Sequence, residues 1–577
     1  MISRVSFSSW YKTFSLPAFY IPILALLLYA NTLTNGFTLD DVLVITKNTY
    51  VKEGVKGIPS LVSYDSFHGY FQQKEQTNLV TGGRYRPLSL VLFAVLYQFF
   101  GSNPLPFHLL NLLLYVLTAF ALLKTFTLIT QDNKGIKPAF AVITTLLFVA
   151  HPVHTEVVNN IKSADELLSF LFSILSLSFF INGHDKKLYR HFVLSGCLFL
   201  LACFSKENAL PFIATFPLVI FLFRSTQSRS IPYVIKSLFP VLLAALLYVV
   251  VRGEVLHWKF GTESDVLINN PFIKWNGVQW IPFSTAEWSA TNMYSLGMYL
   301  KILLFPYPLT HDYYPRQFEI MNWSNPHVLL SAVLIVALLT LLFTYRKWNK
   351  VILFSIVYFF STISIVSNFL FPIGTNFSER FVYMPSLGFC AATAFLLSKI
   401  PKINIQRFLL LLIIVPYSLL VISRNKDWKN NFSLVEADYP VSSNSAKINN
   451  SYAAQLLEIA IKEQSIPERS KLLAQAQLKY SLALKINPTY IEALFGRGST
   501  YFVQGNYSLA VEDYLLAEQI DPNYPSLRTN LVLALREAGK AALKSNDHRT
   551  ALQYLKAAAL RFPNDPEINE LVSQISK

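Results

Sequence analysis

Charged residues and cysteines are both scarce in this chain of 577 residues. Only 14% of the residues are charged while 53% are hydrophobic, which excludes a soluble protein folded around a single core. Aromatic residues are abundant instead, with 46 Phe and 30 Tyr, as suits membrane spans and the interfacial belts beside them. The composition therefore predicts a polytopic membrane protein. The three cysteines all lie in apolar runs, so neither a disulfide framework nor a thiolate metal cluster is expected; they are Cys197, Cys203 and Cys390.

The net charge of +15 does not indicate nucleic-acid binding. Lys and Arg are scattered through short loops between apolar runs, as expected for loops retained on the cytoplasmic side. The stretches 34–86 and 252–289 and everything after 423 are then expected on the non-cytoplasmic side. The basic loops are QDNKGIK, GHDKKLYR, RSTQSR, YRKWNK and PKINIQR.

Thirteen apolar segments lie between and beside these loops. The first follows a basic start without a convincing cleavage site, so we expect an uncleaved transmembrane helix. Segments 87–101 and 290–306 are short for a span of about 20 residues, and we expect half-spans or interfacial helices there. About 11 to 13 hydrophobic helices result, and an odd number of crossings places the C-terminus outside if the N-terminus is inside. The segments are 17–33, 87–101, 105–130, 138–158, 165–182, 192–205, 208–223, 232–251, 290–306, 327–344, 351–372, 381–399 and 407–422.

After about residue 430 the sequence becomes polar, Ala-rich and repetitive. ALKINP ends at Pro488, AEQIDP ends at Pro522 after 34 residues, and AALRFP ends at Pro563. This period and the small and aromatic residues within it are typical of tetratricopeptide repeats, whose stacked helix pairs usually bind another polypeptide. The repeat positions of the middle unit are Gly498, Tyr501, Gly505, Ala510, Tyr514, Ala517 and Pro522.

Four polar clusters lie at the edges of the apolar segments. Ionisable groups that converge at the ends of spans favour a site for a charged ligand over simple helix termini. The clusters are Asp40, Asp41 and Asn48; Arg84, Arg86, His108 and Asn111; His151, His154, Glu156, Asn160, Lys162, Asp165 and Glu166; and Lys206 and Glu207 together with Glu379, Arg380 and Tyr383.

His151, His154 and Glu156 are compatible with a metal site or with a helix end that faces an aqueous cleft. The two histidines are three residues apart, but Pro152 lies between them and the spacing is not that of a zinc protease helix. We therefore predict no metal ligands. No cofactor is required by any motif, and the need for a divalent cation stays open.

Taken in order, the motifs resemble one family, the transmembrane and tetratricopeptide repeat-containing O-mannosyltransferases of the GT-C glycosyltransferase superfamily. The family commonly has GR before its acidic-Leu-Leu motif, where this chain has KSADELL, and the short repeat array suggests a bacterial-type member. The matching stretches are LDDVLVITKN, YRPLSL, HLLN, HPVHTEVV followed by DELL, SKENALPF, LLFPYPLTHDYYP, ERFVYMPSLGFC and RNKDW.

The resemblance implies an all-α membrane domain over 1–423, a linker over 424–450 and about three repeats over 451–577. It implies a polyprenyl-phosphate sugar donor and a secreted or envelope polypeptide acceptor that the repeats recruit, with transfer to Ser or Thr on the non-cytoplasmic side. The membrane would be the bacterial inner membrane with periplasmic repeats, or that of the endoplasmic reticulum in a eukaryote. Mannose as the sugar is inherited from the family.

The resemblance also assigns roles to residues. A catalytic carboxylate falls on Asp40 or Asp41 in the external loop 34–86, and two adjacent carboxylates can raise one pKa into a range useful for a base. We favour Asp41 narrowly. The cations expected to hold the donor phosphate are Arg380, Lys206 and Arg86, and the residues expected to line the substrate site are His151, His154, Glu156, Glu379 and Tyr383.

Two other functions remain compatible with the sequence. One is a non-catalytic membrane scaffold whose repeats organise envelope proteins. The other is a GT-C enzyme that modifies a lipid or a glycan and uses its repeats only to bind partners.

Overall fold

The computed structural model describes residues 7–71, 83–131, 133, 135–224, 230–258, 264, 266–344 and 349–575. The chain is almost entirely α-helical and divides into two compact units. The first unit comprises 1–311 and 320–434, and the second comprises 312–319 and 435–577. The predicted all-α polytopic membrane protein is confirmed.

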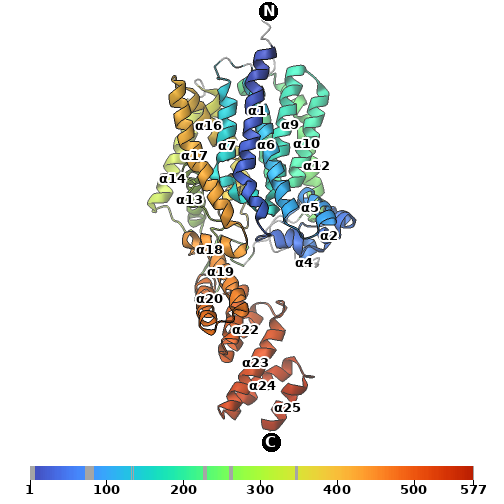
Figure 1. Cartoon of the computed structure of the whole chain (residues 1–577), viewed down its shortest axis with the longest axis vertical. Helices are drawn as coiled ribbons and strands as arrows, with labels where there is room; N and C mark the ends of the chain where they lie inside the picture. Colours follow the sequence, from blue (N-terminus) through green and yellow to red (C-terminus); the bar gives the residue numbers. More distant parts are fainter. Residues whose placement is uncertain are drawn as a thin grey trace, which may run out of the picture. The chain divides into compact units, whose positions relative to one another are not determined.

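Six helices in the described part of the chain are long and apolar enough to cross a membrane. In Figure 1 they run roughly side by side through the first unit. Each coincides with one of the apolar segments predicted from the sequence. They are α1 (Phe7–Tyr29), α6 (Leu105–Thr130), α9 (Ala164–Lys186), α12 (Ile231–Val255), α14 (Pro326–Thr344) and α17 (Ile403–Asp427).

The other apolar segments also form helices, but shorter, broken or less apolar ones. α7 (Ala139–Ala150) is followed by a bend of 55° at the break before Pro152, since proline cannot continue the helical hydrogen bonding. The bent pair counts as one further span, so six or seven helices meet the length and composition of a span, against about eleven predicted crossings. The shorter helices are η5 (Pro152–His154), α8 (Thr155–Asn159), α5 (Pro87–Phe100), α10 (Tyr189–Ser205), η7 (Glu207–Ala214), α11 (Thr215–Phe223), α15 (Lys350–Ile363), η10 (Ser364–Val366) and α16 (Ser386–Ser398), and α13 (Thr285–Leu304) has 20 residues.

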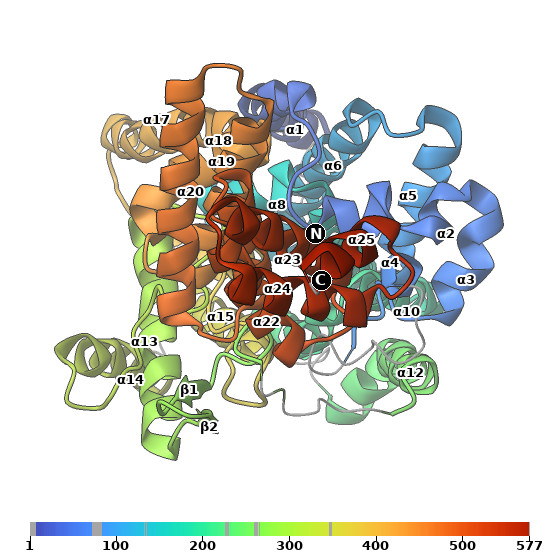
Figure 2. The ribbon, with the colours of Figure 1, turned by 90° about the horizontal axis from the view of Figure 1, so that it is seen from below.

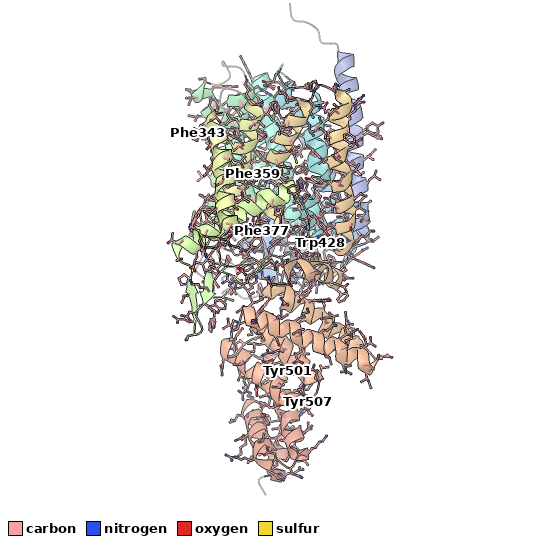
Figure 3. All side chains as sticks on the ribbon, turned by 90° about the vertical axis from the view of Figure 1, so that its left-hand side faces the viewer. Phe343, Phe359, Phe377, Trp428, Tyr501 and Tyr507 are labelled. Carbon is pink, nitrogen blue, oxygen red and sulfur yellow. The ribbon has the colours of Figure 1, made fainter. Side chains whose placement is uncertain are left out.

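The core of the first unit lies around α9, which packs against α6 and α10. In its apolar stretch 83% of the residues are buried, against 17% in α14 and 11% in α17, so α17 and α14 are the two spans that the bundle covers least. Figure 2 places α12 and α14 at the periphery of the bundle. Exposed Phe343 lies toward one end of the bundle and buried Trp428 toward the other in Figure 3.

Short helices form a compact cap from the chain that follows α1, and Figure 1 shows α2, α4 and α5 together at one end of the bundle. The chain between α12 and α13 contributes a two-stranded antiparallel hairpin, in which Trp275 pairs with Trp280. The remaining elements are η1 (Ala30–Thr34), η2 (Val42–Thr46), α2 (Thr49–Lys52), η3 (Gly54–Gly57), α3 (Ile58–Ser63), α4 (His68–Phe71), η6 (Ile161–Ser163), β1 (Ile273–Trp275), β2 (Trp280–Pro282) and η11 (Glu379–Val382).

Consecutive helices of the second unit pack on one another. A Cβ atom at Gly496 would lie 2.3 Å from Cζ of Tyr480, and one at Gly498 would lie 2.8 Å from Cε1 of Tyr514, so glycine allows these helices to approach. The tetratricopeptide assignment stays a prediction. Most of 424–450, the predicted linker, is helical, in the end of α17, in α18 (Asn431–Ser442) and in the start of α19 (Ala446–Lys462). The other helices are α20 (Ile466–Ile486), α21 (Ile491–Val503), α22 (Tyr507–Ile520), α23 (Leu527–Lys544), α24 (His548–Arg561) and α25 (Pro566–Ile575).

The close packing of α15 against α16 yields a stability prediction. A Cβ atom at Gly388 would lie 2.6 Å from the carbonyl oxygen of Ser355, so Gly388→Ala forces the two helices apart. We expect the variant to lose about 1–3 kcal/mol, measured as a lower thermal unfolding midpoint of the full chain in detergent. Gly135→Ala is the control, because no atom lies within 4 Å of its Cβ position. Equal thermal midpoints for Gly388→Ala and Gly135→Ala would contradict the close packing of α15 against α16.

Candidate functional site

The loop that carries the acidic pair is tied to the end of the last span. Asn35 donates a hydrogen bond to Oδ1 of Asn159 (3.1 Å), and Asn159 donates one to Oδ1 of Asn425 (2.7 Å). Asn425 in turn donates to the carbonyl of Leu28 and to Oδ1 of Asn31, both at 2.8 Å. A buried amide is costly unless its hydrogen bonds are made, so this network fixes the ends of α1, α8 and α17 relative to one another.

The backbone just before the acidic pair adopts an unusual conformation. Leu39 has φ of 48°, a left-handed value that is rare for a residue with a branched side chain. Its N–H donates to Oδ1 of Asn431 (2.8 Å), and the N–H of Gly36 donates to the carbonyl of Lys429 (2.9 Å). These contacts to the segment after α17 hold the turn that presents Asp40.

The two adjacent aspartates have different environments. Asp41 is fully buried, and its two carboxylate oxygens accept hydrogen bonds from the backbone N–H groups of Thr38 (2.9 Å) and Lys162 (2.8 Å). Burial, opposed by these hydrogen bonds and assisted by the charge of Asp40, raises the pKa of Asp41 to about 7. Asp41 therefore joins the loop that follows α1 to the segment just before α9, and each of its carboxylate oxygens accepts a backbone hydrogen bond.

Asp40 is the accessible member of the pair, with 40% of its side chain exposed. Its Oδ2 pairs with Nζ of Lys162 at 3.1 Å. Partial burial opposes ionisation, but the positive charges of Lys162, Arg84 and Arg380 outweigh it and hold the pKa of Asp40 below its usual range. Asp40 is therefore an ionised carboxylate among three cations. The catalytic role of either aspartate stays a prediction.

Arg380 and Arg84 differ in how they are held. Arg380 donates from Nη1 to Oε1 of buried Glu156 (2.8 Å) and from its backbone N–H to Oε2 (3.1 Å), and 22% of its side chain is exposed. The Arg84 guanidinium lies 5.0 Å from the ring centroid of Phe67 and, within the described chain, pairs with no carboxylate. Burial and the like charges of Arg86 and Arg380 lower the pKa of Arg84.

Arg86 and Lys206, two of the three cations predicted to hold a phosphate, are engaged with carboxylates. Arg86 donates two hydrogen bonds to Glu207, at 3.0 and 2.5 Å, and one to Asp165 at 2.8 Å. Lys206 lies 2.6 Å from Oε1 of Glu166 and 3.6 Å from Oδ1 of Asp165, and 4% of its side chain is exposed. This buried network packs α5, α9 and η7 together, and it leaves neither cation free for a ligand.

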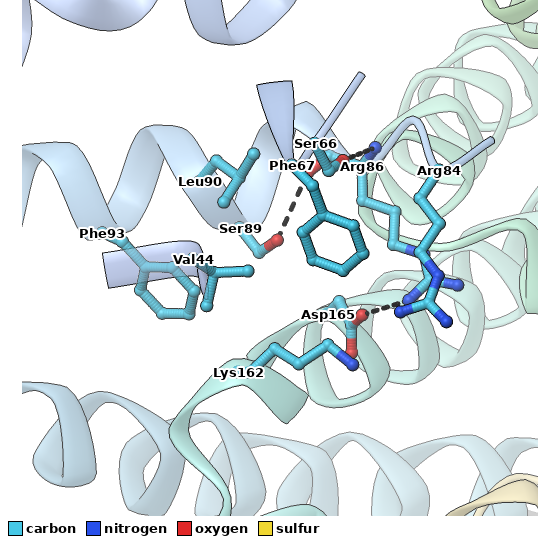
Figure 4. A pocket seen from close by; sticks show the side chains of 10 residues that line it. All are labelled: Val44, Ser66, Phe67, Arg84, Arg86, Ser89, Leu90, Phe93, Lys162 and Asp165. Carbon is cyan, nitrogen blue, oxygen red and sulfur yellow. Dashed lines mark hydrogen bonds and ion pairs between the residues drawn. The ribbon is translucent and has the colours of Figure 1, made fainter. Parts of the chain in front are cut away.

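A small pocket lies where residues of this network meet the loop that carries the acidic pair. Its polar side holds Arg84 and Lys162, and its other side is apolar. Figure 4 shows the Arg84 and Lys162 side chains extending toward the same space beside Asp165. The lining of the pocket thus includes three cations, two hydroxyl groups and one carboxylate. Its lining residues are Val44, Ser66, Phe67, Arg84, Arg86, Ser89, Leu90, Phe93, Lys162 and Asp165.

The structure does not bring the predicted histidines to this pocket. His154 is fully buried, 2.9 Å from both the hydroxyl of Tyr115 and the hydroxyl of Ser386, and its ring packs edge-on against Tyr383. His151, also fully buried, lies 3.1 Å from the carbonyl oxygen of Leu303. These three residues, predicted to line the substrate site, occupy the packed interior instead.

The remaining residues predicted to line the substrate site are two glutamates, which bind a backbone N–H group or Arg380. Glu379 is buried and accepts a hydrogen bond from the backbone N–H of Thr310 (2.7 Å), while Glu156 holds Arg380. Among the described residues, no group of three His, Cys, Asp or Glu side chains could hold a metal ion.

Two residues of this site, Arg84 and Lys162, were given no role in binding or catalysis by the sequence prediction. Arg84 belongs to the RYRPLSL motif, and its neighbour Arg86 was chosen instead. Lys162 precedes DELL at the place where the resembled family commonly has arginine. That lysine, a second cation in place of the arginine of the resembled family, was the available signal in the sequence.

The chain is similar over most of its length to several curated proteins. It is 27% identical over 530 residues to protein O-mannosyl-transferase TMTC3 of Homo sapiens, which covers 86% of this chain. It is 26% identical over 515 residues to TMTC1 of Homo sapiens and 24% identical over 476 residues to F38B6.6 of Caenorhabditis elegans, both named protein O-mannosyl-transferase; these matches cover 82% and 81% of this chain. No protein-family model matches the chain.

These matches confirm the resemblance inferred from the motifs. They cover 54%, 55% and 62% of the lengths of the three relatives, so the chain spans little more than half of each.

The raised pKa of Asp41 predicts a pH-dependent stability. Between the usual aspartate pKa of about 3.9 and the folded value of about 7, the folded state holds more protons than the unfolded state, so stability falls as the pH rises. We expect the thermal midpoint of the unmodified chain to fall more from about pH 5 to about pH 8 than that of Asp41→Asn, which has no such titration. Glu53→Gln, which changes an exposed carboxylate of the same loop, serves as the control. The same pH response in Asp41→Asn and the unmodified chain would exclude this coupling.

Proposed function

We propose that this chain, which is similar over most of its length to protein O-mannosyl-transferases, is a membrane glycosyltransferase. It transfers a sugar, mannose by analogy with the names of its relatives, from a polyprenyl-phosphate donor to Ser or Thr hydroxyls of proteins on the non-cytoplasmic side. The observation that carries the proposal is the surroundings of Asp40, a partly exposed carboxylate under the influence of three cations, whose ion-pair partner Lys162 lines the pocket.

Asp40 is the proposed general base. A Ser or Thr hydroxyl is a weak nucleophile, so a carboxylate within hydrogen-bond reach must take its proton during attack on the anomeric carbon. The new bond joins the acceptor oxygen to that carbon, and the bond from the carbon to the phosphate oxygen breaks with its electron pair. The polyprenyl phosphate leaves with that pair, and a single displacement of this kind inverts the anomeric centre. Asp41 positions the loop through its two backbone hydrogen bonds.

Arg84 and Lys162, with Arg380 nearby, are the proposed partners of the donor phosphate. Fixed cations stabilise the charge that develops on a departing phosphate. Arg84 suits this role because it lines the pocket and, among the described residues, forms no direct ion pair with a carboxylate. This choice replaces Arg86 and Lys206, whose charges are balanced by Glu207, Asp165 and Glu166.

Delivery of the two substrates follows from the two parts of the chain. The lipid tail of the donor diffuses in the bilayer that the spanning helices occupy. We propose that the second unit, as a tetratricopeptide array, recruits the secreted or envelope polypeptide that accepts the sugar. The repeat assignment and the recruited partner rest on the spacing of the sequence motifs.

The base role predicts that Asp40→Asn abolishes sugar transfer while the chain still folds. An amide has no basicity to accept the hydroxyl proton, so a loss of about 10²-fold to 10⁴-fold is expected. The measurement is transfer from polyprenyl-phosphate mannose to Ser/Thr peptides by the purified full chain, followed by mass spectrometry of the peptides. Glu53→Gln, an exposed carboxylate in the same loop, should retain transfer.

Full transfer by Asp40→Asn would remove the base assignment. Absence of transfer by the unmodified chain from any polyprenyl-phosphate sugar, with glycopeptides unchanged in a deletion strain, would favour a scaffold. A changed lipid-linked glycan with intact glycopeptides would point to a lipid or glycan acceptor.

Arg84 and Lys206 should differ in the property that their loss affects. Arg84→Gln removes a cation from the pocket, so donor affinity falls while the thermal midpoint changes little. Lys206→Gln leaves buried carboxylates without their partner, which costs about 3–5 kcal/mol and lowers the midpoint. Donor titrations and thermal unfolding of both full-length variants separate the two roles. Weak donor binding by Lys206→Gln without loss of stability would assign the phosphate to Lys206 and contradict its structural role.

A further inference from the structure

Lys162 contacts both members of the acidic pair through different atoms. Its side-chain Nζ lies 3.1 Å from Oδ2 of Asp40, and its backbone N–H donates to Oδ1 of Asp41 at 2.8 Å. The backbone contact is enclosed, since Asp41 is fully buried, whereas the side-chain contact ends on a carboxylate that is 40% exposed. The amine can therefore change partners without moving the backbone of either residue.

We propose that Lys162 exchanges partners during the reaction: its amine holds Asp40 while the pocket is empty and transfers to the donor phosphate when the lipid binds. The exchange rests on the proposed function, because it requires an anionic donor. It makes Lys162 a positioning residue that keeps Asp40 paired until the donor is present.

The neighbouring cations are less suited to such an exchange. Arg86 and Lys206 are held by carboxylates that are largely buried, and Arg380 is held by buried Glu156. Removal of one of these cations would leave a buried charge without a partner, which is strongly unfavourable. Lys162 pairs, within the described chain, only with Asp40, and water can reach that carboxylate after the amine leaves.

The position of Lys162 also allows its amine to reach a second partner, a phosphate bound in the pocket. Its side chain lines the same pocket as Arg84, and Figure 4 shows the two extending toward a common space. A lysine amine is a compact charge on a flexible stem with three donors, so it can rotate from one anion to another. A phosphate placed against Arg84 would then attract the Lys162 amine and displace Asp40 as its partner.

The exchange has a chemical consequence. Asp40 paired with an ammonium group is a weak base, and the loss of that pair increases its proton affinity. The freed carboxylate then accepts the proton of the Ser or Thr hydroxyl as the acceptor oxygen bonds to the anomeric carbon. The polyprenyl phosphate departs with the electrons of the broken bond while Lys162 and Arg84 balance its charge. The donor must therefore bind before Asp40 becomes an effective base.

The test uses the purified full chain in detergent and a polyprenyl phosphate without a sugar as the probe. Lys162→Met keeps most of the side-chain volume and removes the amine, so we expect the probe to bind about tenfold more weakly. Lys162→Arg should retain binding, since it keeps a cation. Lys47→Met, which removes an exposed positive charge from the same external loop, is the matched control and should bind as the unmodified chain does.

The infrared carboxylate band of Asp40 gives a readout that a purely structural role would not change. The band is assigned by its absence in Asp40→Asn. The probe should shift it in the unmodified chain, and in Lys162→Met it should lie near the shifted position before any probe is added.

The outcomes separate this proposal from the proposed function. Equal probe binding by Lys162→Met and the unmodified chain, or an Asp40 band that the probe does not shift, overturns the exchange but leaves the glycosyltransferase standing. Failure of the unmodified chain to bind polyprenyl phosphate removes the donor class and the exchange with it.

Discussion

A chain of buried side-chain amides joins the end of the first span to the end of the last, and the position of the acidic loop depends on it. Asn35, Asn159 and Asn425 satisfy one another across helices that are far apart in sequence. In a largely apolar bundle each unmet amide would cost more than a typical hydrogen bond contributes, so the three are constrained as a set. The backbone contacts of Gly36 and Leu39 to the segment after α17 extend the same constraint to Asp40.

The charges around the site are balanced in two layers. The deeper layer is a nearly closed network in which Arg86 and Lys206 are surrounded by acidic side chains, and it fixes three helices without offering a binding surface. The outer layer is different, because Asp40 is exposed and Arg84 lacks a carboxylate partner among the described residues. The first layer thus supplies rigidity, and the second supplies the chemistry that a ligand could use.

Sequence patterns predicted the fold class and the apolar segments well, because length and composition alone determine which segments can enter lipid. They also singled out the acidic pair, whose catalytic role stays a prediction. Sequence patterns could not distinguish Asp40 from Asp41, since Asp41 accepts a hydrogen bond from the backbone N–H of Lys162, which lies 121 positions away in the sequence. The pairing of Lys206 was equally inaccessible. Lys206 has an extended backbone, with φ of −162° and ψ of 140°, so it and Glu207 point to different partners. The histidines were chosen by residue type, and only the packed structure reveals that they lie in the interior.

The partial exposure of Asp40 bears on what happens after each transfer. In the proposed reaction, every sugar attached to a hydroxyl leaves one proton on Asp40, and that proton must be released before the next cycle. A carboxylate with 40% of its side chain exposed can return the proton directly to bulk water, without a relay of buried groups. In the proposed reaction, regeneration of the base therefore requires no proton transfer through the protein.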